Sequence, residues 1–361
     1  LIVRTHVLFE LAPHVQQVAA GLGTATLLIA GLIALVQVDI KRVIAYSTMS
    51  QIGYMFLGAG IGAYSNAMFH LMTHAFFKAL LFLGAGIVIH ALAGEQDIRK
   101  MGGLRKLMPK TWCAMLAGGL ALTGIPPFSG FFSKDSILAA SLADGTYGKI
   151  LFVAGLVGTF LTGVYTFRML FVVFGGEPSA YVQEHPPHAE HGLVKWSMAI
   201  PVGVLTVLAV FGGWIQFAGV WDPTSDWLEP VAKPLVEATN SQEALASILA
   251  VGLGALGIGV AWWIYSAHRV AAPKSQPVLE HKFYFDELYD AVFYRPAVFL
   301  AHALARWVER PLVFGSVREL SEGIRGLGLD TSRLQTGLVR TYALAIAASL
   351  AVVTVVFVAV R

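Results

Sequence analysis

The sequence contains only one cysteine, Cys113, among 361 residues. A single cysteine excludes a disulfide framework within the chain, and it excludes a Cys-x-x-Cys metal or iron–sulfur site. Charged residues are also scarce, since they make up 13% of the chain, against roughly 25% in a soluble domain. Both shortages argue against a soluble fold and against a small domain held by disulfides or zinc.

Apolar residues are abundant and lie in long runs. They make up 56% of the chain, and the mean hydropathy is +0.68. The runs reach about 20 residues or more, the length at which a helix spans a bilayer. The pI is near 8.9, but the lysines and arginines border these runs. The basic balance therefore indicates a membrane protein and no nucleic-acid partner.

We predict an all-α polytopic membrane protein with about eight transmembrane helices, one of them discontinuous. The fourth apolar run is too long for one helix and contains GIPPFSG, from Gly124 to Gly130. Two prolines between glycines break a helix, and the piece after this break at 124–130 is too short to span alone. The predicted spans are 16–37, 43–62, 66–91, 112–143, 149–174, 196–217, 246–267 and 341–360.

Lysine and arginine in the loops predict the orientation of the chain. If the side that holds residue 1 is called outside, the inside loops carry 18 lysines and arginines and the outside loops carry four. Ten of the 18 lie between residues 268 and 340, where the charge rule is weaker. Without that segment, the inside loops still carry eight lysines and arginines against four in the outside loops. We therefore expect the basic loops to face the cytoplasm or its equivalent.

The segment 268–340 is predicted to contain a long amphipathic helix in the membrane interface. From about Phe283 to Leu327, apolar residues recur at helical spacing with arginines between them. Pro296 and Pro311 should kink or interrupt this helix. Two or three short surface helices are the alternative interpretation.

Two further patterns favour ordinary structural roles. A Gly-x-Gly-x-x-Gly motif lies inside an apolar span, whereas a nucleotide site needs it between a strand and a helix, so we expect close helix packing. Three histidines share one inside loop, which we interpret as solvated, with weak metal binding left open. These residues are Gly252, Gly254 and Gly257, and His185, His188 and His191.

The stretch MFHLMTHAFFKALLF, from Met68 to Phe82, holds three titratable side chains in an otherwise apolar span. His70, His74 and Lys78 are four residues apart, so they share one helical face and rise by about 6 Å per step. A lysine near the bilayer midplane costs about 2.5–3.5 kcal/mol on insertion scales, so it should face other helices and water. Helical side chains lean toward the N-terminus, so the Lys78 ammonium should reach back toward His74.

This arrangement is suited to relaying protons. An imidazole donates through one nitrogen and accepts through the other, and burial can bring a lysine toward neutral titration. A network that only packs the helices is the structural alternative. A zinc site is a third interpretation, because histidines at i and i+4 can chelate zinc, but the next group is a lysine and no carboxylate or cysteine is near in sequence.

Three more charges lie within predicted spans. Lys134 and Asp135 follow the helix break, and broken helices are tolerated only beside protein or a water-filled cavity, where transporters place ion sites. A structural Lys134–Asp135 ion pair, or snorkelling to the interface, is the alternative. Arg168 is either a counter-charge or a helix-packing anchor. Together with the two histidines and the lysine of the third span, these residues form the candidate proton pathway.

Four long stretches occur in the following order: DIKRVIAYSTMSQIGYMF (Asp39 to Phe56), FHLMTHAFFKALLFL (Phe69 to Leu83), MGGLRKLMP (Met101 to Pro109) and GFFSKDSIL (Gly130 to Leu138). They closely resemble the antiporter-like subunit L family of respiratory complex I, the proton-pumping NADH:quinone oxidoreductase. The tail is similar too, so the resemblance covers essentially the whole chain. Some of these motifs are shared with multisubunit cation/proton antiporters and membrane-bound hydrogenases.

The resemblance implies two inverted five-helix repeats, each with a broken helix, and 16–174 looks like the second. By this resemblance Lys78 is the central-axis lysine, His70 and His74 connect to it, and Lys134 is the lysine of the second broken helix. The first repeat is absent from the sequence, so we expect the chain to be the C-terminal part of a longer protein. The other divisions are an N-terminal loop (1–15), two further helices with loops (175–267), the interfacial region (268–340) and a last helix (341–361).

The resemblance also implies a function. The chain would translocate protons as a membrane-arm subunit of NADH:quinone oxidoreductase, without redox chemistry of its own and driven by quinone reduction elsewhere. No cofactor is expected in this chain, while FMN, iron–sulfur clusters and quinone would belong to partner subunits. Its partners would be neighbouring membrane-arm subunits of a hetero-oligomer and the lipid bilayer. A bacterial inner membrane fits better than a mitochondrial inner or thylakoid membrane. The alternatives are the large subunit of a cation/proton antiporter and a scaffold subunit without an active channel.

The charge pattern generates a topology prediction. Reporter tags inserted within 95–108 or 270–280 should be accessible from the inside, and tags within 144–148 or 222–240 from the outside. Labelling of each tagged protein in oriented vesicles checks this outcome. Detection of 95–108 and 222–240 on the same side would overturn the span count and the discontinuous helix with it.

Overall fold

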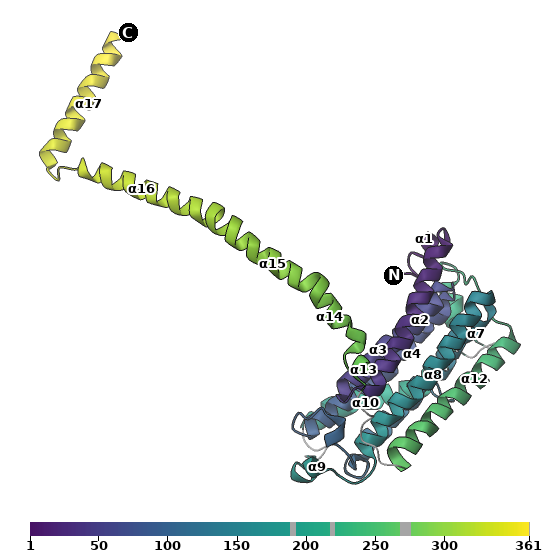
Figure 1. The fold of residues 1–361 in the computed structure, drawn as a ribbon. Coiled ribbons are helices and arrows are strands. Elements are labelled where there is room, and N and C mark those ends of the chain that lie inside the picture. The colour runs from purple at the N-terminus through teal and green to yellow at the C-terminus, as the bar shows by residue number, and fades with distance from the viewer. Residues whose placement is uncertain (188–192, 217–220, 268–275, 361) are drawn as a thin grey trace. The chain divides into compact units, whose positions relative to one another are not determined.

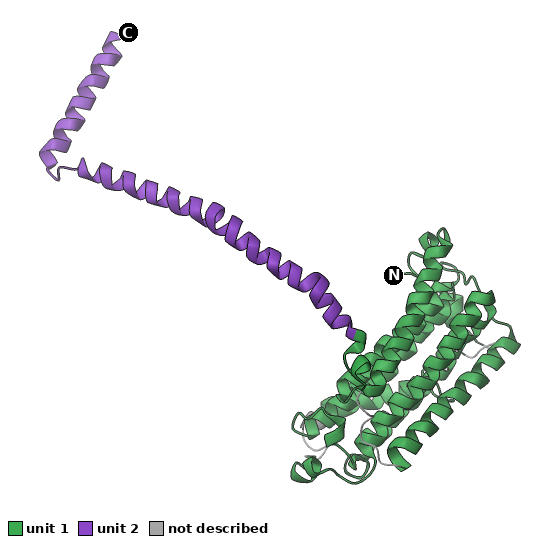
Figure 2. Ribbon diagram, in the orientation of Figure 1, with its two compact units in different colours: residues 1–283 green, residues 284–361 purple. Residues whose placement is uncertain are grey.

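The computed structural model describes residues 1–187, 193–216, 221–267 and 276–360, and the regular structure in these ranges is helical. The chain divides into two compact units, Leu1–Phe283 and Tyr284–Arg361 (Figure 2). The all-α class predicted from the sequence is therefore confirmed.

The first unit is a bundle of long helices joined by short ones (Figure 1). Each of the first seven predicted spans coincides with a helix or, for the fourth, with the pair α6 and α7. The helices are α1 (His6–Glu10), α2 (Pro13–Val36), α3 (Ile40–Gly60), α4 (Tyr64–Ala91), η1 (Ile98–Lys100), α5 (Leu104–Leu107), α6 (Pro109–Thr123), α7 (Ser129–Ala143), α8 (Gly145–Phe174), α9 (Ala180–Glu184), α10 (Leu193–Phe211), α11 (Pro223–Leu228), α12 (Asn240–Ala261), the π-helical η2 (Trp262–Ala267) and α13 (Pro277–Glu280), with η3 (Lys282–Tyr284) at the junction of the units.

Five of the described helices are long and apolar enough to cross a membrane. They are α2, α4, α8, α12 with η2, and α17 (Val339–Ala359) of the second unit. The apolar part of α10 is shorter, and α3 carries polar residues on a buried side. Four of these are fully or almost fully buried, namely Ser47, Ser50, Gln51 and Tyr54. The bundle therefore has a polar interior surface along α3.

The predicted discontinuous helix is confirmed. The helix α6 ends at Thr123 and α7 begins at Ser129. Gly124 follows α6 with a φ of 84°, a left-handed conformation that glycine adopts without the penalty of a Cβ atom. The two prolines after Ile125 lack the N–H groups that would continue the helix. The break therefore leaves carbonyl groups at the end of α6 without helical partners.

Two of the three motif glycines of α12 serve close packing. A Cβ atom at Gly257 would lie 2.4 Å from the carbonyl oxygen of Phe160 on α8. A Cβ atom at Gly254 would lie 3.1 Å from the Thr123 side chain, beside the helix break. Nothing lies within 4 Å of the same position at Gly252. The packing interpretation therefore holds at Gly254 and Gly257.

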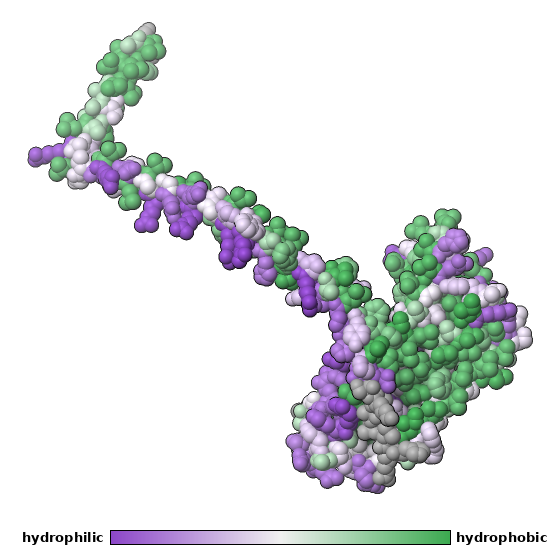
Figure 3. Space-filling view, viewed as in Figure 1, coloured by the Kyte–Doolittle hydropathy of each residue, from purple (hydrophilic) through white to green (hydrophobic). Residues whose placement is uncertain are grey.

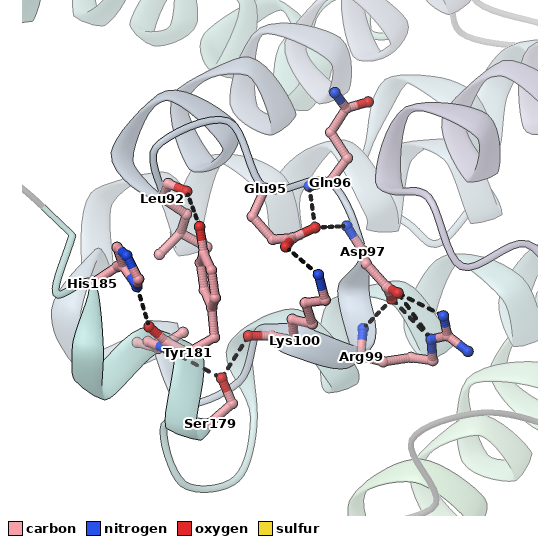
Figure 4. Close-up of polar contacts among 10 residues, drawn as sticks. Leu92, Glu95, Gln96, Asp97, Arg99, Lys100, Ser179, Tyr181 and His185 are labelled. Carbon is pink, nitrogen blue, oxygen red and sulfur yellow. Dashed lines mark hydrogen bonds and ion pairs between the residues drawn. The ribbon is translucent and has the colours of Figure 1, made fainter.

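A polar cluster, which we call the loop clasp, joins three loops at one end of the bundle (Figure 4). Glu95 accepts from the Lys100 ammonium at 2.8 Å and from two backbone N–H groups at 2.9 Å each. Asp97 pairs with Arg99 at 2.6 Å. The residues of the clasp are Leu92, Glu95, Gln96, Asp97, Arg99, Lys100, Ser179, Tyr181 and His185.

Backbone and hydroxyl hydrogen bonds connect the clasp to its surroundings. Asp39, between α2 and α3, forms a one-residue antiparallel bridge with Asp97. The hydroxyls of Ser179 and Tyr181 donate to carbonyl oxygens of the 92–100 loop at 2.5 and 3.2 Å. The clasp thereby holds the ends of α2, α3, α4 and α9 together.

Acid should loosen the loop clasp. The hydrogen bond from Lys100 lowers the pKa of Glu95, and the one from Arg99 lowers the pKa of Asp97. A carboxyl whose pKa is lowered by folding stabilises the fold above its ordinary pKa of about 4, and this contribution is lost as the pH falls through the lowered value. The double substitution Glu95→Gln and Asp97→Asn should therefore speed amide exchange in residues 95–100 at pH 7, and the difference from the parent should vanish toward about pH 3.

Hydrogen exchange of the two proteins at matched pH measures this difference. Glu184→Gln, at an exposed carboxylate on α9, is the control and should exchange like the parent in the same loop. A difference that stays the same at pH 7 and at about pH 3 would show that the carboxylate charges do not hold the clasp.

The second unit is one long helix followed by an apolar one. The segments α14 (Phe285–Tyr289), η4 (Asp290–Tyr294), α15 (Arg295–Leu304), η5 (Ala305–Phe314) and α16 (Gly315–Arg333) run into one another, and α17 follows (Figure 1). Pro296 comes just after the π-helical η4, and Pro311 lies within the π-helical η5. The prolines therefore do not interrupt the helix, because they lie in or beside wider π-helical segments. Polar and apolar side chains lie on different sides along it (Figure 3).

Candidate functional site

The helix α4 carries the two histidines and the lysine of the candidate pathway on its buried side. It runs without interruption from Tyr64 to Ala91, and His70, His74 and Lys78 are 0%, 7% and 4% exposed. The spacing of four residues therefore places all three groups inside the bundle. The rest of this side is apolar or small, so any hydrogen-bond partners must come largely from other helices.

Hydrogen bonds tie this row to neighbouring helices rather than along α4. The Lys78 ammonium donates to the hydroxyl oxygen of Ser47 on α3. The rings of His70 and His74 have centroids 6.2 Å apart, and Nε2 of His74 has no hydrogen-bond partner among the described residues. Lys78 therefore bonds across to α3, where a hydroxyl oxygen serves as acceptor, and its approach toward His74 stays a prediction.

The polar side of α3 was not predicted from the sequence. Ser47, Ser50, Gln51 and Tyr54 follow the i, i+3, i+4, i+7 spacing of one helical face, and this spacing is the signal that could have found them. Gln51 bonds His70 at 3.2 Å, Ser50 donates to a carbonyl of α2 at 3.0 Å, and Tyr54 donates to a carbonyl of α8 at 2.6 Å. This face of α3 therefore connects the row of His70, His74 and Lys78 on α4 with the helices α2 and α8.

Ser133, one residue before Lys134, was also missed. Its hydroxyl lies 2.9 Å from Nδ1 of His70 and 2.6 Å from the Thr73 hydroxyl. These bonds are buried and join α4 to the first turns of α7. The α4 row and the broken helix are therefore parts of one polar network.

Lys134 reaches back across the break. Its ammonium donates to the carbonyl oxygen of Thr123, the last residue of α6. The C-terminal end of a helix carries partial negative charge and free carbonyl groups, so it is a favourable place for a cation. Asp135 is 4% exposed and faces Ser247 of α12, without a hydrogen-bond partner among the described residues.

Two other segments cover the break. The indole N–H of Trp214 donates to the carbonyl oxygen of Pro127 at 2.9 Å. A Cβ atom at Gly213 would lie 2.6 Å from Cα of Ser129, so the turn after α10 packs directly on the start of α7. From the other side, α12 approaches at Gly254. Neighbouring segments therefore cover part of the break, while Pro126 and Pro127 remain exposed.

Arg168 makes its contacts elsewhere. Its guanidinium is fully buried and donates to the carbonyl oxygen of Gln37, just after α2, at 2.8 Å. It also lies 5.7 Å from the ring centroid of Tyr265. Since these contacts join α8 to α2 and η2, they favour the helix-packing anchor of the two roles considered.

The loop histidines form no recognisable metal site in the described part of the chain. Among the described residues, no group of three or more His, Cys, Asp or Glu is arranged to hold a metal ion. His185 stacks on Tyr181 with ring centroids 4.5 Å apart. His188 and His191 lie outside the described residues.

Comparison with known proteins shows what the chain is similar to. Residues 1–162 match the family model described as "NADH:quinone oxidoreductase/Mrp antiporter, TM". A solved structure of the Mrp complex from Dietzia sp. DQ12-45-1b aligns with a TM-score of 0.51 over 72% of this chain and 50% of that one, at 23% identity. This structural likeness concerns the fold alone.

Similarity in sequence extends over most of the chain. NADH-quinone oxidoreductase subunit L of Pseudomonas aeruginosa is 44% identical over 85% of this chain and 49% of its own length. Subunit L of Mycobacterium tuberculosis is 39% identical over 95% of this chain and 55% of its own length. Subunit L of Rickettsia felis is 35% identical over 99% of this chain and 58% of its own length. The chain is therefore similar to subunit L over most of its own length. It spans about half the length of these relatives.

Gly124 should be essential to the geometry of the break. A Cβ atom there would lie 2.8 Å from both Cε and Nζ of Lys134, and the left-handed φ costs a non-glycine residue about 1–2 kcal/mol. Gly124→Ala should therefore lower the midpoint of thermal unfolding of the detergent-extracted protein. Gly252→Ala, where the added methyl meets open space, is the matched control and should leave it unchanged or higher. Equal midpoints for the two variants would contradict a tight fit of Lys134 over Gly124.

Proposed function

We propose that this chain is the C-terminal part of a proton-translocating membrane subunit of NADH:quinone oxidoreductase. The observation that carries the proposal is the set of buried titratable groups on adjacent helices: His70, His74 and Lys78 on α4, and Lys134 beside the broken helix, with Ser133 of α7 bonded to His70. The similarity to subunit L over most of the chain supports it.

The energetic cost of the network supports a functional role. Each lysine inside a membrane span costs about 2.5–3.5 kcal/mol on insertion scales, and intramembrane ionisable groups usually mark ion or proton pathways. Ser47 and the Thr123 carbonyl are neutral partners, so they relieve part of this cost without cancelling the charge. A chain that needed only packing could hold the same helices together with apolar side chains at lower cost.

In the proposed mechanism, protons pass between titratable groups through hydroxyls and waters. Lys78 holds a proton against Ser47, His70 exchanges protons with Ser133, and Lys134 holds one at the helix break. Asp135 adds a carboxylate beside Lys134, and Arg168 stabilises the bundle from its other contacts. Quinone reduction in partner subunits, which would hold FMN and the iron–sulfur clusters, drives the cycle.

The division of the chain follows from this proposal. Residues 16–174 would be one antiporter-like repeat, 175–267 two further spans with loops, 268–340 the lateral helix region, and 341–361 a final span. The amphipathic surface of the second unit would lie along neighbouring membrane-arm subunits and lipid, in a bacterial inner membrane. Its exposed apolar residues, among them Leu300, Leu304 and Val308, support this placement.

A cation/proton antiporter subunit is the second candidate. The family model covers both classes, and the Mrp complex has a similar fold. Sodium-dependent transport would favour this candidate, and co-purification with flavin and iron–sulfur subunits would favour the first. Normal pumping by a Lys78 and Lys134 double variant would instead favour a scaffold without an active channel.

Substitution of Lys78 tests the proposal. Lys78→Met keeps most of the side-chain volume and removes the buried ammonium, so the complex should assemble and remain stable but pump poorly. Lys78→Arg should also fail, because a guanidinium stays protonated and cannot cycle. His74→Ala should have a milder effect, because water can fill part of the gap.

The measurement is proton uptake into vesicles alongside NADH oxidation, on samples matched for assembly. We expect uptake to fall for Lys78→Met, with NADH oxidation slowed wherever the two steps are tightly coupled. Full proton uptake by Lys78→Met would mean that the ammonium is structural and that the proposed pathway is wrong.

A further inference from the structure

His70 is held by two different helices, one at each ring nitrogen. Nε2 lies 3.2 Å from Oε1 of Gln51 on α3, and Nδ1 lies 2.9 Å from the hydroxyl of Ser133 on α7. Both His70 and Gln51 have no exposed surface. The tautomer of the ring is therefore set by protein groups and not by bulk water.

The hydrogen bonds assign each proton. An amide oxygen only accepts, so Nε2 of His70 donates to Gln51. In a neutral imidazole the other nitrogen then has no hydrogen, so Nδ1 accepts from Ser133. The oxygen of Ser133 can in turn accept from Thr73, whose hydroxyl lies 2.6 Å away. The chain of donors therefore runs from Thr73 through Ser133 to His70 and ends at Gln51.

We propose that Gln51 is a positioning residue that keeps the resting proton of His70 on Nε2 and leaves Nδ1 as the nitrogen that exchanges protons with the broken helix. This inference rests on the proposed proton-translocating function. An amide cannot carry a proton onward, so Gln51 closes the α3 side of His70 to transfer. His70 therefore exchanges protons through Nδ1 with Ser133, next to Lys134.

Protonation of His70 needs no reactant other than the relayed proton. Ser133 gives its hydroxyl proton to Nδ1, its oxygen takes one from Thr73, and Thr73 takes the incoming proton. Both hydroxyls end intact, and imidazole plus one proton becomes imidazolium. The titratable and charged groups around the ring are His74 and Lys78 on α4, Tyr54 on α3, and Lys134 on α7.

Two substitutions at Gln51 should shift the pH dependence of pumping in opposite directions. Gln51→Met removes the acceptor at Nε2, which disfavours imidazolium, so the alkaline limb of proton uptake should move to lower pH and uptake at neutral pH should fall roughly three- to tenfold, as expected for one lost hydrogen bond. Gln51→Glu places an anionic acceptor there, which favours imidazolium, so the alkaline limb should move to higher pH.

The experiment uses the whole complex in vesicles, with proton uptake and NADH oxidation followed across the pH range. Gln16→Met is the matched control, because Gln16 is another buried, hydrogen-bonded amide, on α2, whose partner is Tyr64. Gln16→Met should keep the pH dependence of proton uptake of the parent complex. Ser133→Ala removes the partner of Nδ1 and should lower uptake like Gln51→Met, so it tests the same chain if Gln51→Glu does not assemble.

The outcomes separate this inference from the proposed function. If Lys78→Met fails to pump while Gln51→Met pumps with the parent profile, the role of Gln51 is wrong and the proposed function stands. If Lys78→Met pumps fully, the proposed function fails and the role of Gln51 with it. A loss of uptake in both Gln51 variants without any shift of the pH profile would show that Gln51 only supports packing.

Discussion

A buried ammonium needs an oxygen atom close by, and this requirement organises the interior of the bundle. Lys78 finds the hydroxyl of Ser47 on α3, and Lys134 finds the carbonyl of Thr123 at the end of α6. Neither partner is a carboxylate. Burial of a charge against a neutral oxygen leaves much of the desolvation cost uncompensated, so both sites cost stability. The helices that supply these oxygens must therefore be held firmly by other contacts.

The helix break follows from the same requirement. In an unbroken helix the carbonyl of Thr123 would accept from a backbone N–H four residues later and would not be free for Lys134. The left-handed Gly124 and the two prolines release it. Trp214 and the close approach of α12 at Gly254 then cover part of the backbone at the break. The single hydrogen bond from Lys134 to the Thr123 carbonyl thus depends on parts of α6, α7, α10 and α12.

The sequence predicted those features that depend on local chemistry. The row on α4 follows from helical spacing, and the break follows from prolines between glycines. The partners Ser47, Gln51 and Ser133 were missed, because serine and glutamine are common in helices and only packing decides which of them meet a histidine or lysine. The long helix of the second unit was predicted as well, but Pro296 and Pro311 were expected to kink or interrupt it. Its prolines lie in or beside π-helical segments, which no local pattern distinguished from a helix end.

The hydrogen-bond partners of Lys78 and Lys134 are different chemical groups. A hydroxyl can donate as well as accept: Ser47 accepts from Lys78 and donates its own hydrogen to the carbonyl oxygen of Ile44 at 2.7 Å. A carbonyl oxygen only accepts, so Thr123 requires an N–H from Lys134 in either state. Lys134 also has the buried carboxyl group of Asp135 next to it on α7. The two sites thus differ in how far the hydrogen bond extends: the Ser47 hydroxyl passes it on to the backbone of α3, whereas the Thr123 carbonyl ends it at the break.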